Sequence, residues 1–243
     1  MQAMSSDMQG RARKPPFLIV SQSDTSGSVA LAAEVDALLR EDTSGFLKSR
    51  ARGVLEVMLA GGDAFFVRDG VTGELLAFAG MFDGAGGLVE FGAQVCRLNG
   101  FRLQRQLNGL CLARQLQRAG STKAVFATVM EGNGGSMRNL AACGFVQEAP
   151  DPDFLKQAGI SASGFRGWTL HRISTRAAIL QAARTLSLAR SGGLLENGLG
   201  HQLAVEWRLQ GVAELGHAVR PSVRPGFAVG RRMTSPLDHM TAG

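Results

Sequence analysis

The stretch KAVFATVMEGNGGSMRNLAACGF, residues 123–145, carries the clearest structural signal in the chain. Residues 123–130 are mostly apolar and predict a buried strand. Asn133 then offers a side chain that can cap a helix or turn towards a ligand, and Ser136 adds a hydroxyl on the first turn. Gly144 supplies the positive φ at which many helices end. The stretch therefore predicts a strand, a short asparagine-capped helix and a glycine stop.

The segments on either side predict further strands and helices. Apolar runs bounded by turn residues indicate the strands, and apolar side chains at helical spacing indicate the helices. We expect strands at residues 16–22, 64–69, 74–83, 88–97, 145–149 and 167–173, and helices at 29–41, 46–60 and 101–119. This order predicts a mixed α/β (α+β) fold with a mainly antiparallel central sheet that is flanked by helices.

Three segments are expected along the chain. Residues 1–15 predict a disordered lead-in, and residues 16–175 form the α/β domain. Residues 176–243 form a C-terminal extension with a basic amphipathic helix, a strand at 201–210 and a Pro/Gly-rich tail. The extension could cover the sheet, build an acceptor pocket or mediate dimerisation, so a homodimer is one expectation.

The composition indicates which partners and sites the sequence favours. The formal net charge of +6 favours anions such as nucleic acid, membrane headgroups or a phosphorylated cofactor. No block of five or more Lys and Arg is present, which argues against a nucleic-acid-binding tail. The three cysteines lack CxxC spacing and the four histidines lack an HExxH motif, so we expect neither a disulfide framework nor a metal site.

The sequence also lacks signals for export and membrane insertion. After Arg11, Arg13 and Lys14 only PPFLIV follows, which is too short for the apolar region of a signal peptide. No run reaches the roughly 18 apolar residues of a membrane span. We therefore expect a cytoplasmic protein.

The order of elements over residues 16–175 resembles the GNAT family of acyl-CoA-dependent N-acyltransferases. Members commonly carry Asn at the end of the fifth strand, Ala or Ser three residues later, and Gly-Phe at the end of the next helix. Asn133, Ser136, Gly144 and Phe145 match this pattern at the family's spacing. The resemblance implies that acetyl-CoA, or another acyl-CoA, is the co-substrate and that an amine is the acceptor. It also places Asn133 and Ser136 near the pantetheine and the thiolate.

A second GNAT motif is a loop of the form R-G-x-G-x-G after a strand that splays from its neighbour. This loop opens a helix whose unpaired backbone N–H groups hold the pyrophosphate of coenzyme A. The matching run is NGFRLQRQL, residues 99–107, where Asn99, Arg102 and Gln104 replace an arginine and two glycines. Their long side chains could block the pocket, or Arg102 or Arg105 could pair with a phosphate. The resemblance assigns the pyrophosphate to the N–H groups of Gly100, Phe101, Arg102, Leu103, Gln104 and Arg105.

Acyl transfer to an amine needs a neutral amine, a polarised thioester carbonyl and a proton for the leaving thiolate. The resemblance implies that backbone N–H groups on the splayed strand, within Gln94, Val95 and Cys96, polarise the carbonyl. Glu90 is the candidate general base, because a residue two pleats before Gln94 faces the same side of a regular strand. Asp83 is a weaker candidate, and an exposed strand carboxylate is the alternative interpretation of Glu90.

The protonation of the thiolate departs from the usual family pattern. Many members use a tyrosine in the helix after the asparagine, but the sequence contains no tyrosine, and Leu140 stands at the matching position. Members that resemble ribosomal-protein N-terminal acetyltransferases also have a serine at the position that matches Ser136, and they also lack that tyrosine. Ser136, or a water that it holds, is therefore the nearest proton donor.

Two other functions stay open. A degenerate GNAT fold could serve as a binding or regulatory module without catalysis. A basic nucleic-acid binder is the third hypothesis, although the basic segments lack interleaved aromatic residues. The sequence gives neither the acceptor nor the acyl chain length.

Overall fold

The computed structural model describes residues 17–41, 45–46, 50–98 and 100–209 of the 243-residue chain. The expected lead-in at residues 1–15, Asn99 and the tail from residue 210 lie outside the described residues. Within these ranges, no helix is both long and apolar enough to cross a membrane.

The described residues form one sheet of nine strands with helices on both of its faces. The strands are β1 (Phe17–Gln22), β2 (Ala64–Asp69), β3 (Leu75–Asp83), β4 (Val89–Cys96), β5 (Val125–Met130), β6 (Phe145–Glu148), β7 (Trp168–Ile173), β8 (Leu195–Glu196) and β9 (Gln202–Arg208). The helices are α1 (Ser28–Arg40), α2 (Arg52–Ala60), α3 (Leu103–Ala119), α4 (Gly134–Ala142), α5 (Pro152–Gln157) and α6 (Thr175–Arg190), with a 3-10 turn at Ala85–Gly87.

Most elements begin and end within a residue or two of their expected positions, but α2 does not. A helix was expected from residue 46, whereas Phe46, Arg50 and Ala51 are not helical and α2 begins at Arg52. The side chains of Phe46 and Arg50 instead line a pocket, so tertiary contacts override the local helical pattern. Helix α5 was not expected, although Asp151 caps it by accepting the Phe154 N–H at 2.6 Å.

The strand order is β6-β7-β5-β4-β3-β2-β1-β9-β8. Strands β1 to β4 form an antiparallel meander, and β5 pairs antiparallel with β7. Two junctions are parallel, namely β4 with β5 and β1 with β9. The mixed, mainly antiparallel sheet that the sequence predicts is therefore confirmed.

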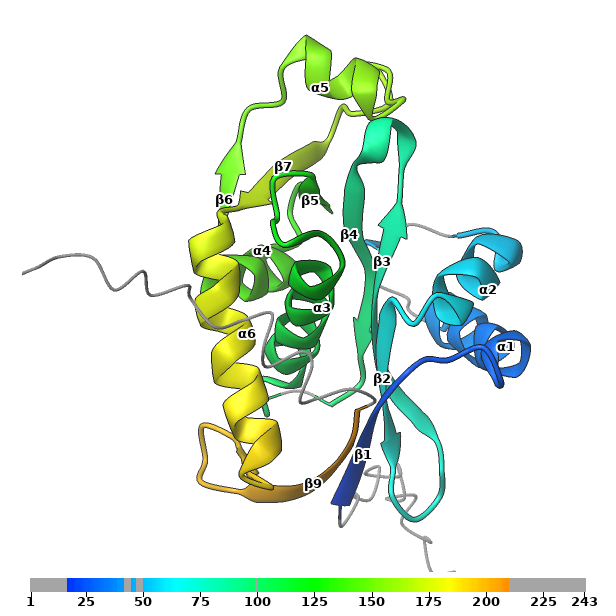
Figure 1. Cartoon of the computed structure of the whole chain (residues 1–243), viewed down its shortest axis with the longest axis vertical. Helices are drawn as coiled ribbons and strands as arrows, with labels where there is room; N and C mark the ends of the chain where they lie inside the picture. Colours follow the sequence, from blue (N-terminus) through cyan, green and yellow to red (C-terminus); the bar gives the residue numbers. More distant parts are fainter. Residues whose placement is uncertain (1–16, 42–44, 47–49, 99, 210–243) are drawn as a thin grey trace, which may run out of the picture.

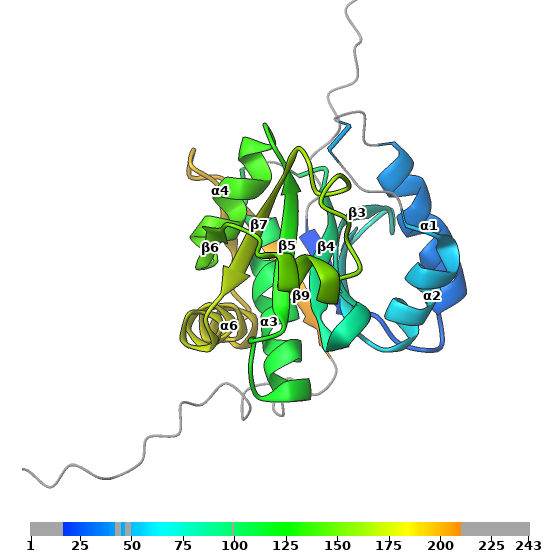
Figure 2. The ribbon, with the colours of Figure 1, turned by 90° about the horizontal axis from the view of Figure 1, so that it is seen from above.

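The buried apolar residues that the structure describes form three clusters, and the two largest lie between the sheet and its helices. Helices α1 and α2 cover one face of the sheet, and α3 and α6 lie on the other (Figures 1 and 2). The larger core joins the buried side chains of α3, including Leu107 and Leu110, to those of β5 and α6. The smaller core joins Leu55 and Leu59 of α2 to Phe78 of β3. These two cores hold the sheet between its helices, because each face of the sheet packs against the apolar face of a helix.

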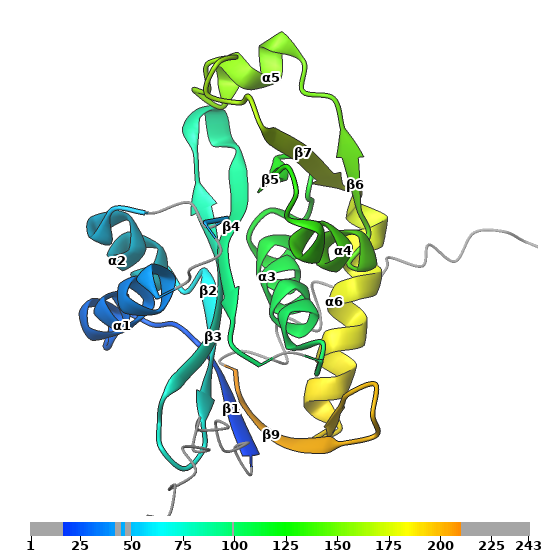
Figure 3. The same cartoon turned by 180° about the vertical axis from the view of Figure 1, so that it is seen from behind.

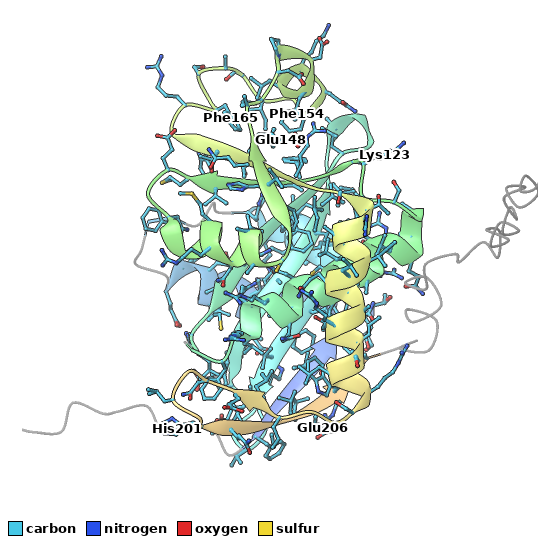
Figure 4. The ribbon with its side chains drawn as sticks, turned by 90° about the vertical axis from the view of Figure 1, so that its left-hand side faces the viewer. Lys123, Glu148, Phe154, Phe165, His201 and Glu206 are labelled. Atoms are coloured by element: carbon cyan, nitrogen blue, oxygen red, sulfur yellow. The ribbon has the colours of Figure 1, made fainter. Side chains whose placement is uncertain are left out.

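The described part of residues 176–243 completes the same sheet. Strand β9 lies parallel to β1, with Leu18 opposite Val205. Helix α6 lies against α3, where Thr185 is fully buried beside Gly109. Figure 4 shows α6 between the two ends of the molecule, with His201 and Glu206 at one end and Phe154 and Phe165 at the other.

Candidate functional site

A gap in the sheet defines the site. Strands β4 and β5 pair only through Val89 with Val125 and Glu90 with Phe126. Both strands then continue, β4 to Cys96 and β5 to Met130, so they diverge after their first residues (Figure 3). Such a splay exposes main-chain groups of both strands within the sheet, where they can bind a ligand instead of a neighbouring strand.

A β-bulge lies in β4 beside this gap. Gly92 pairs with Gly80 and Val95 pairs with Phe78, so two residues of β4 oppose one residue of β3. Ala93 within the bulge has φ of 51°, a left-handed conformation that is rare for a residue with a side chain.

The bulge reverses which side of β4 each residue faces. Before it, Val89 and Phe91 pack in the larger core; after it, Cys96 packs there and Val95 packs against the smaller one. Glu90 and Gln94 therefore face opposite sides of the sheet, and the expectation that they share a face is wrong. The regular two-residue period fails because the bulge adds one residue to the strand.

A main-chain donor beyond the bulge points into the gap. The Arg97 N–H donates to the Leu76 carbonyl of β3 at 2.9 Å. Because main-chain groups alternate along the regular part of a strand, the N–H group of Cys96, which lies beyond the bulge, points the other way, towards the side that β5 has left.

A pocket of about 60 Å³ lies at this splay. Part of its lining is buried and apolar, from Phe91, Ala127, Val129 and Leu140. The half-buried part is formed by Arg50, Glu90, Gln94, Asn133 and Ser136, together with the rings of Phe46 and Trp168. Four residues that the sequence singled out, Glu90, Gln94, Asn133 and Ser136, thus line one pocket.

Two described neighbours in the pocket, Arg50 and Thr128, contact the Glu90 carboxylate. Its Oε2 lies 2.6 Å from Nη2 of Arg50, and its Oε1 accepts from the Thr128 hydroxyl at 3.1 Å. Arg50 also lies over the ring of Phe82, 4.5 Å from the ring centroid, and Phe82 is the cross-strand neighbour of Glu90. The Glu90 side chain is only 13% exposed, so it is not a solvated carboxylate at a sheet edge.

Asn133 caps α4, because its Oδ1 accepts the Ser136 N–H at 3.1 Å. Gly144 ends the segment with φ of 96°, as the sequence predicts. The Asn133 side chain also lines the pocket beside Ser136, so the cap positions both polar groups next to the gap. Leu140, at the position of the family's tyrosine, contributes an apolar surface to the pocket.

The start of α3 has an unusual backbone. Gly100 has φ of 88°, and Arg102, directly before the helix, is left-handed with φ of 55°. Ala93 and Arg102 are the two non-glycine residues with positive φ among the described residues. Arg102 thus adopts a backbone conformation that glycine takes most readily, and its side chain is exposed.

The first turn of α3 has unpaired main-chain donors. In the described ranges no side chain caps this helix, and the N–H groups of Leu103 and Gln104 have no hydrogen-bond partner. The Gln104 side chain donates to Asn108 at 3.3 Å and so lies along the helix. The Arg105 side chain is half-buried, and its main-chain carbonyl accepts from the Gln181 side chain of α6 at 3.2 Å. Of the three long side chains, Arg102 is the exposed one.

The remaining predicted residues lie between the pocket and α3. Val95 and Cys96 end β4 outside the pocket lining, and Phe101 and Leu103 are buried in the core. Burial raises the pKa of the Cys96 thiol to about 11, and burial also raises the pKa of the Cys143 thiol. Both thiols are therefore protonated near neutral pH, which argues against a cysteine nucleophile. No group of three or more His, Cys, Asp or Glu in the described residues could hold a metal ion.

Sequence reasoning missed Arg50, Thr128, Phe46 and Trp168. Arg50 comes from the segment before α2, forty positions from Glu90, and no local pattern links the two. Thr128 lies in the predicted central strand, and its hydroxyl reaches Glu90 from β5 to β4. A polar residue within an otherwise apolar strand was the one available signal.

Two features that the GNAT resemblance implies are present in the topology. A strand splays from its parallel neighbour, and it leads through a glycine-containing loop into a helix. The arrangement of β4, β5 and α3 thus matches two features of the expected GNAT-type fold.

No protein-family model matches the chain, and no curated protein matches its sequence. Solved acetyltransferase structures are similar to it. The ribosomal-protein-S18-alanine N-acetyltransferase from Escherichia coli is 11% identical, with a TM-score of 0.45 over 65% of this chain and 94% of that chain. A Mycobacterium tuberculosis protein in complex with CoA is 13% identical, with a TM-score of 0.45 over 64% and 98%. Ard1 from Thermoplasma volcanium is 11% identical, with a TM-score of 0.46 over 65% and 97%. These likenesses give no substrate, so the function proposed below rests on the geometry of the pocket.

Proposed function

We propose that the chain is an N-acyltransferase that moves an acetyl group from acetyl-CoA to a primary amine by direct attack. The observation that carries this proposal is the splay of β4 from β5, with the Cys96 N–H beyond the bulge pointing into the gap, beside a pocket lined by Glu90. A thioester in this gap would have a donor for its carbonyl and a carboxylate for the proton of the amine.

The start of α3 would bind the pyrophosphate. The N–H groups of Leu103 and Gln104 have no partner among the described residues, and the positive end of the helix dipole favours an anion there. The exposed Arg102 adds a positive charge beside them. The pantetheine would then run along the open edge of β4, past Cys96 and Val95, to the pocket.

The chemistry follows from the groups around the pocket. The amine attacks the thioester carbonyl, and Glu90 takes the proton from the amine, directly or through water. The N–H group of Cys96 stabilises the negative charge on the carbonyl oxygen. The carbon–sulfur bond then breaks, and the thiolate takes a proton from Ser136 or from a water that Ser136 holds.

Calorimetric titration with acetyl-CoA, coenzyme A and desulfo-coenzyme A tests the proposal, with release of free thiol in an amine screen as the second readout. We expect micromolar binding of all three ligands and thiol release that needs an amine. No binding at millimolar ligand would contradict the proposal.

One observation favours a second candidate, a GNAT-shaped binding module without catalysis. Glu90 is engaged by Arg50 at 2.6 Å and by Thr128 at 3.1 Å, so the carboxylate is committed to structural partners. Under this hypothesis the protein binds coenzyme A but releases no thiol with any amine. The same two measurements therefore separate the candidates.

A further inference from the structure

The pocket contains a cation that the proposed acyl transfer does not use. Arg50 lines it, its side chain is only 14% exposed, and its Nη2 lies 2.6 Å from Glu90. A buried charge needs compensation, and here the two residues compensate each other. A structural ion pair could lie anywhere in the core, but this one lies where the acceptor must approach the base.

The guanidinium also has spare donor capacity. Arginine carries five N–H donors in one plane, and the buried Nε of Arg50 has no hydrogen-bond partner among the described residues. Buried donors are rarely left unpaired in native proteins, and Arg50 lines the pocket, so its guanidinium has donors to offer an oxygen of a ligand that binds there. A planar guanidinium suits a carboxylate, which can accept two parallel hydrogen bonds.

We propose that Arg50 is a specificity-determining residue that binds the carboxylate of the acceptor, and that the acceptor is an α-amino acid. This inference rests on the proposed acyltransferase function and deepens it. When the acceptor binds, Arg50 releases Glu90 and pairs with the carboxylate of the acceptor. Glu90 then pairs with the amine of the acceptor. The pocket keeps its charge balance, because each member of the pair exchanges one partner for another of the same sign.

This exchange explains how a paired carboxylate acts as a base. A simple amine would have to compete with Arg50 for Glu90, whereas an amino acid offers Arg50 a replacement anion. The rings of Phe46 and Trp168 line the same pocket, so apolar amino-acid side chains fit it best.

Binding of the acceptor itself tests the inference without turnover. Leucine and phenylalanine are titrated into the protein, with and without coenzyme A, beside leucinamide and phenylalaninamide, which keep the amine that Glu90 would bind. The acid and the amide differ in the carboxylate that Arg50 would bind. We expect the wild-type protein to bind each acid at least about tenfold more tightly than its amide, as for a charge-assisted hydrogen bond.

Two variants assign the selectivity to Arg50. Arg50→Gln should reduce the preference for the acid to less than about twofold. Arg52→Gln is the matched control, because Arg52 is nearby, 53% exposed and paired with Glu56, and it should keep the full preference. Thermal unfolding of each variant checks that the fold is intact, and Arg50→Lys provides a second variant that keeps the charge but loses the planar fork.

The outcomes separate this inference from the proposed function. Equal binding of acid and amide by the wild-type protein, or no binding of either, overturns the amino-acid acceptor even if coenzyme A binds. A preference that survives in Arg50→Gln overturns the role of Arg50. Failure of coenzyme A itself to bind contradicts the acyltransferase proposal instead.

Discussion

The helices α3 and α4 both begin at the gap in the sheet, but their N-termini are built differently. At α4 the Asn133 side chain accepts the Ser136 N–H, so the chain satisfies this donor itself. At α3 the preceding residue is the left-handed Arg102, and no described side chain caps the helix. One N-terminus is closed by its own residue, and the other leaves main-chain donors for an external group.

This difference assigns different tasks to the two ends of the gap. The donors at α3 suit an anion such as a pyrophosphate, whereas the α4 end places Asn133 and Ser136 beside Glu90 in the pocket. If the proposed function is right, changes at α3 should alter the affinity for coenzyme A, and changes near Glu90 should alter turnover.

Glu90→Gln should give the largest effect. It should reduce turnover without changing the affinity for coenzyme A. Loss of the base is expected to lower kcat about 100-fold or more, while the Kd for coenzyme A changes less than about twofold. Steady-state release of free thiol with the best acceptor measures kcat, and calorimetry measures the Kd for coenzyme A.

Asp83→Asn is the matched control. Asp83 was the weaker candidate base, but its carboxylate binds Arg118 at 2.9 Å and does not line the pocket. The Asp83→Asn variant should keep the wild-type kcat. A large loss of kcat in Asp83→Asn, together with an active Glu90→Gln variant, would indicate that Asp83 is the base.

Gly109→Ala tests what holds α3 in place when its N-terminus has no cap. A Cβ at residue 109 would lie 2.8 Å from Cβ of Thr185 and 3.3 Å from the Gln181 carbonyl of α6. We expect a loss of about 2 kcal/mol in the free energy of unfolding, since overpacking displaces the helix.

Denaturant unfolding measures this loss, and Gly53→Ala in α2 is the control. Nothing lies within 4 Å of a Cβ at residue 53, so that change should be neutral or stabilise by roughly 0.5–1 kcal/mol. Equal effects at the two glycines would show that α6 does not position α3.

Arg102→Gly combined with Gln104→Gly tests whether the N-terminus of α3 binds coenzyme A. If the exposed Arg102 contacts a phosphate, the double variant should bind coenzyme A about tenfold more weakly, with kcat little changed. If instead the two side chains obstruct the loop, affinity should rise.

Arg102→Gly alone provides an independent check on the backbone. Because φ is 55° at this position, glycine relieves the left-handed strain and should stabilise the fold by up to about 1 kcal/mol. A clear loss of stability would argue that the Arg102 side chain has contacts that outweigh this strain.

The contrast between the two helix starts also explains how far the sequence could go. The α4 unit was predicted almost to the residue, because its strand, its Asn133 cap and its Gly144 stop are local signals. The conformation of Arg102 could not be predicted, because arginine is rarely left-handed and its neighbours in residues 99–107 give no local signal for a positive φ at this position.

Non-local features account for the other failures. The bulge at Ala93 changes the face of every later residue in β4, and Gly92 inside the strand was its one signal. The Arg50–Glu90 pair joins segments that approach only after the sheet forms, and β9 reaches β1 across nearly the whole described chain. Such pairings depend on packing rather than on local propensity.

Asn133→Ala should give the smallest effect and tests whether α4 is closed by its own residue. Without the Oδ1 acceptor, the Ser136 N–H loses its partner, and we expect a loss of about 1 kcal/mol in the free energy of unfolding. Asn133→Asp keeps the acceptor and should retain most of this stability. The affinity for coenzyme A separates the two tasks of the residue: if Asn133 only caps α4, affinity should follow the small loss of helix order. A tenfold loss of affinity in both variants would instead show that the Asn133 amide contacts the ligand directly, since aspartate restores the cap but not the amide donor.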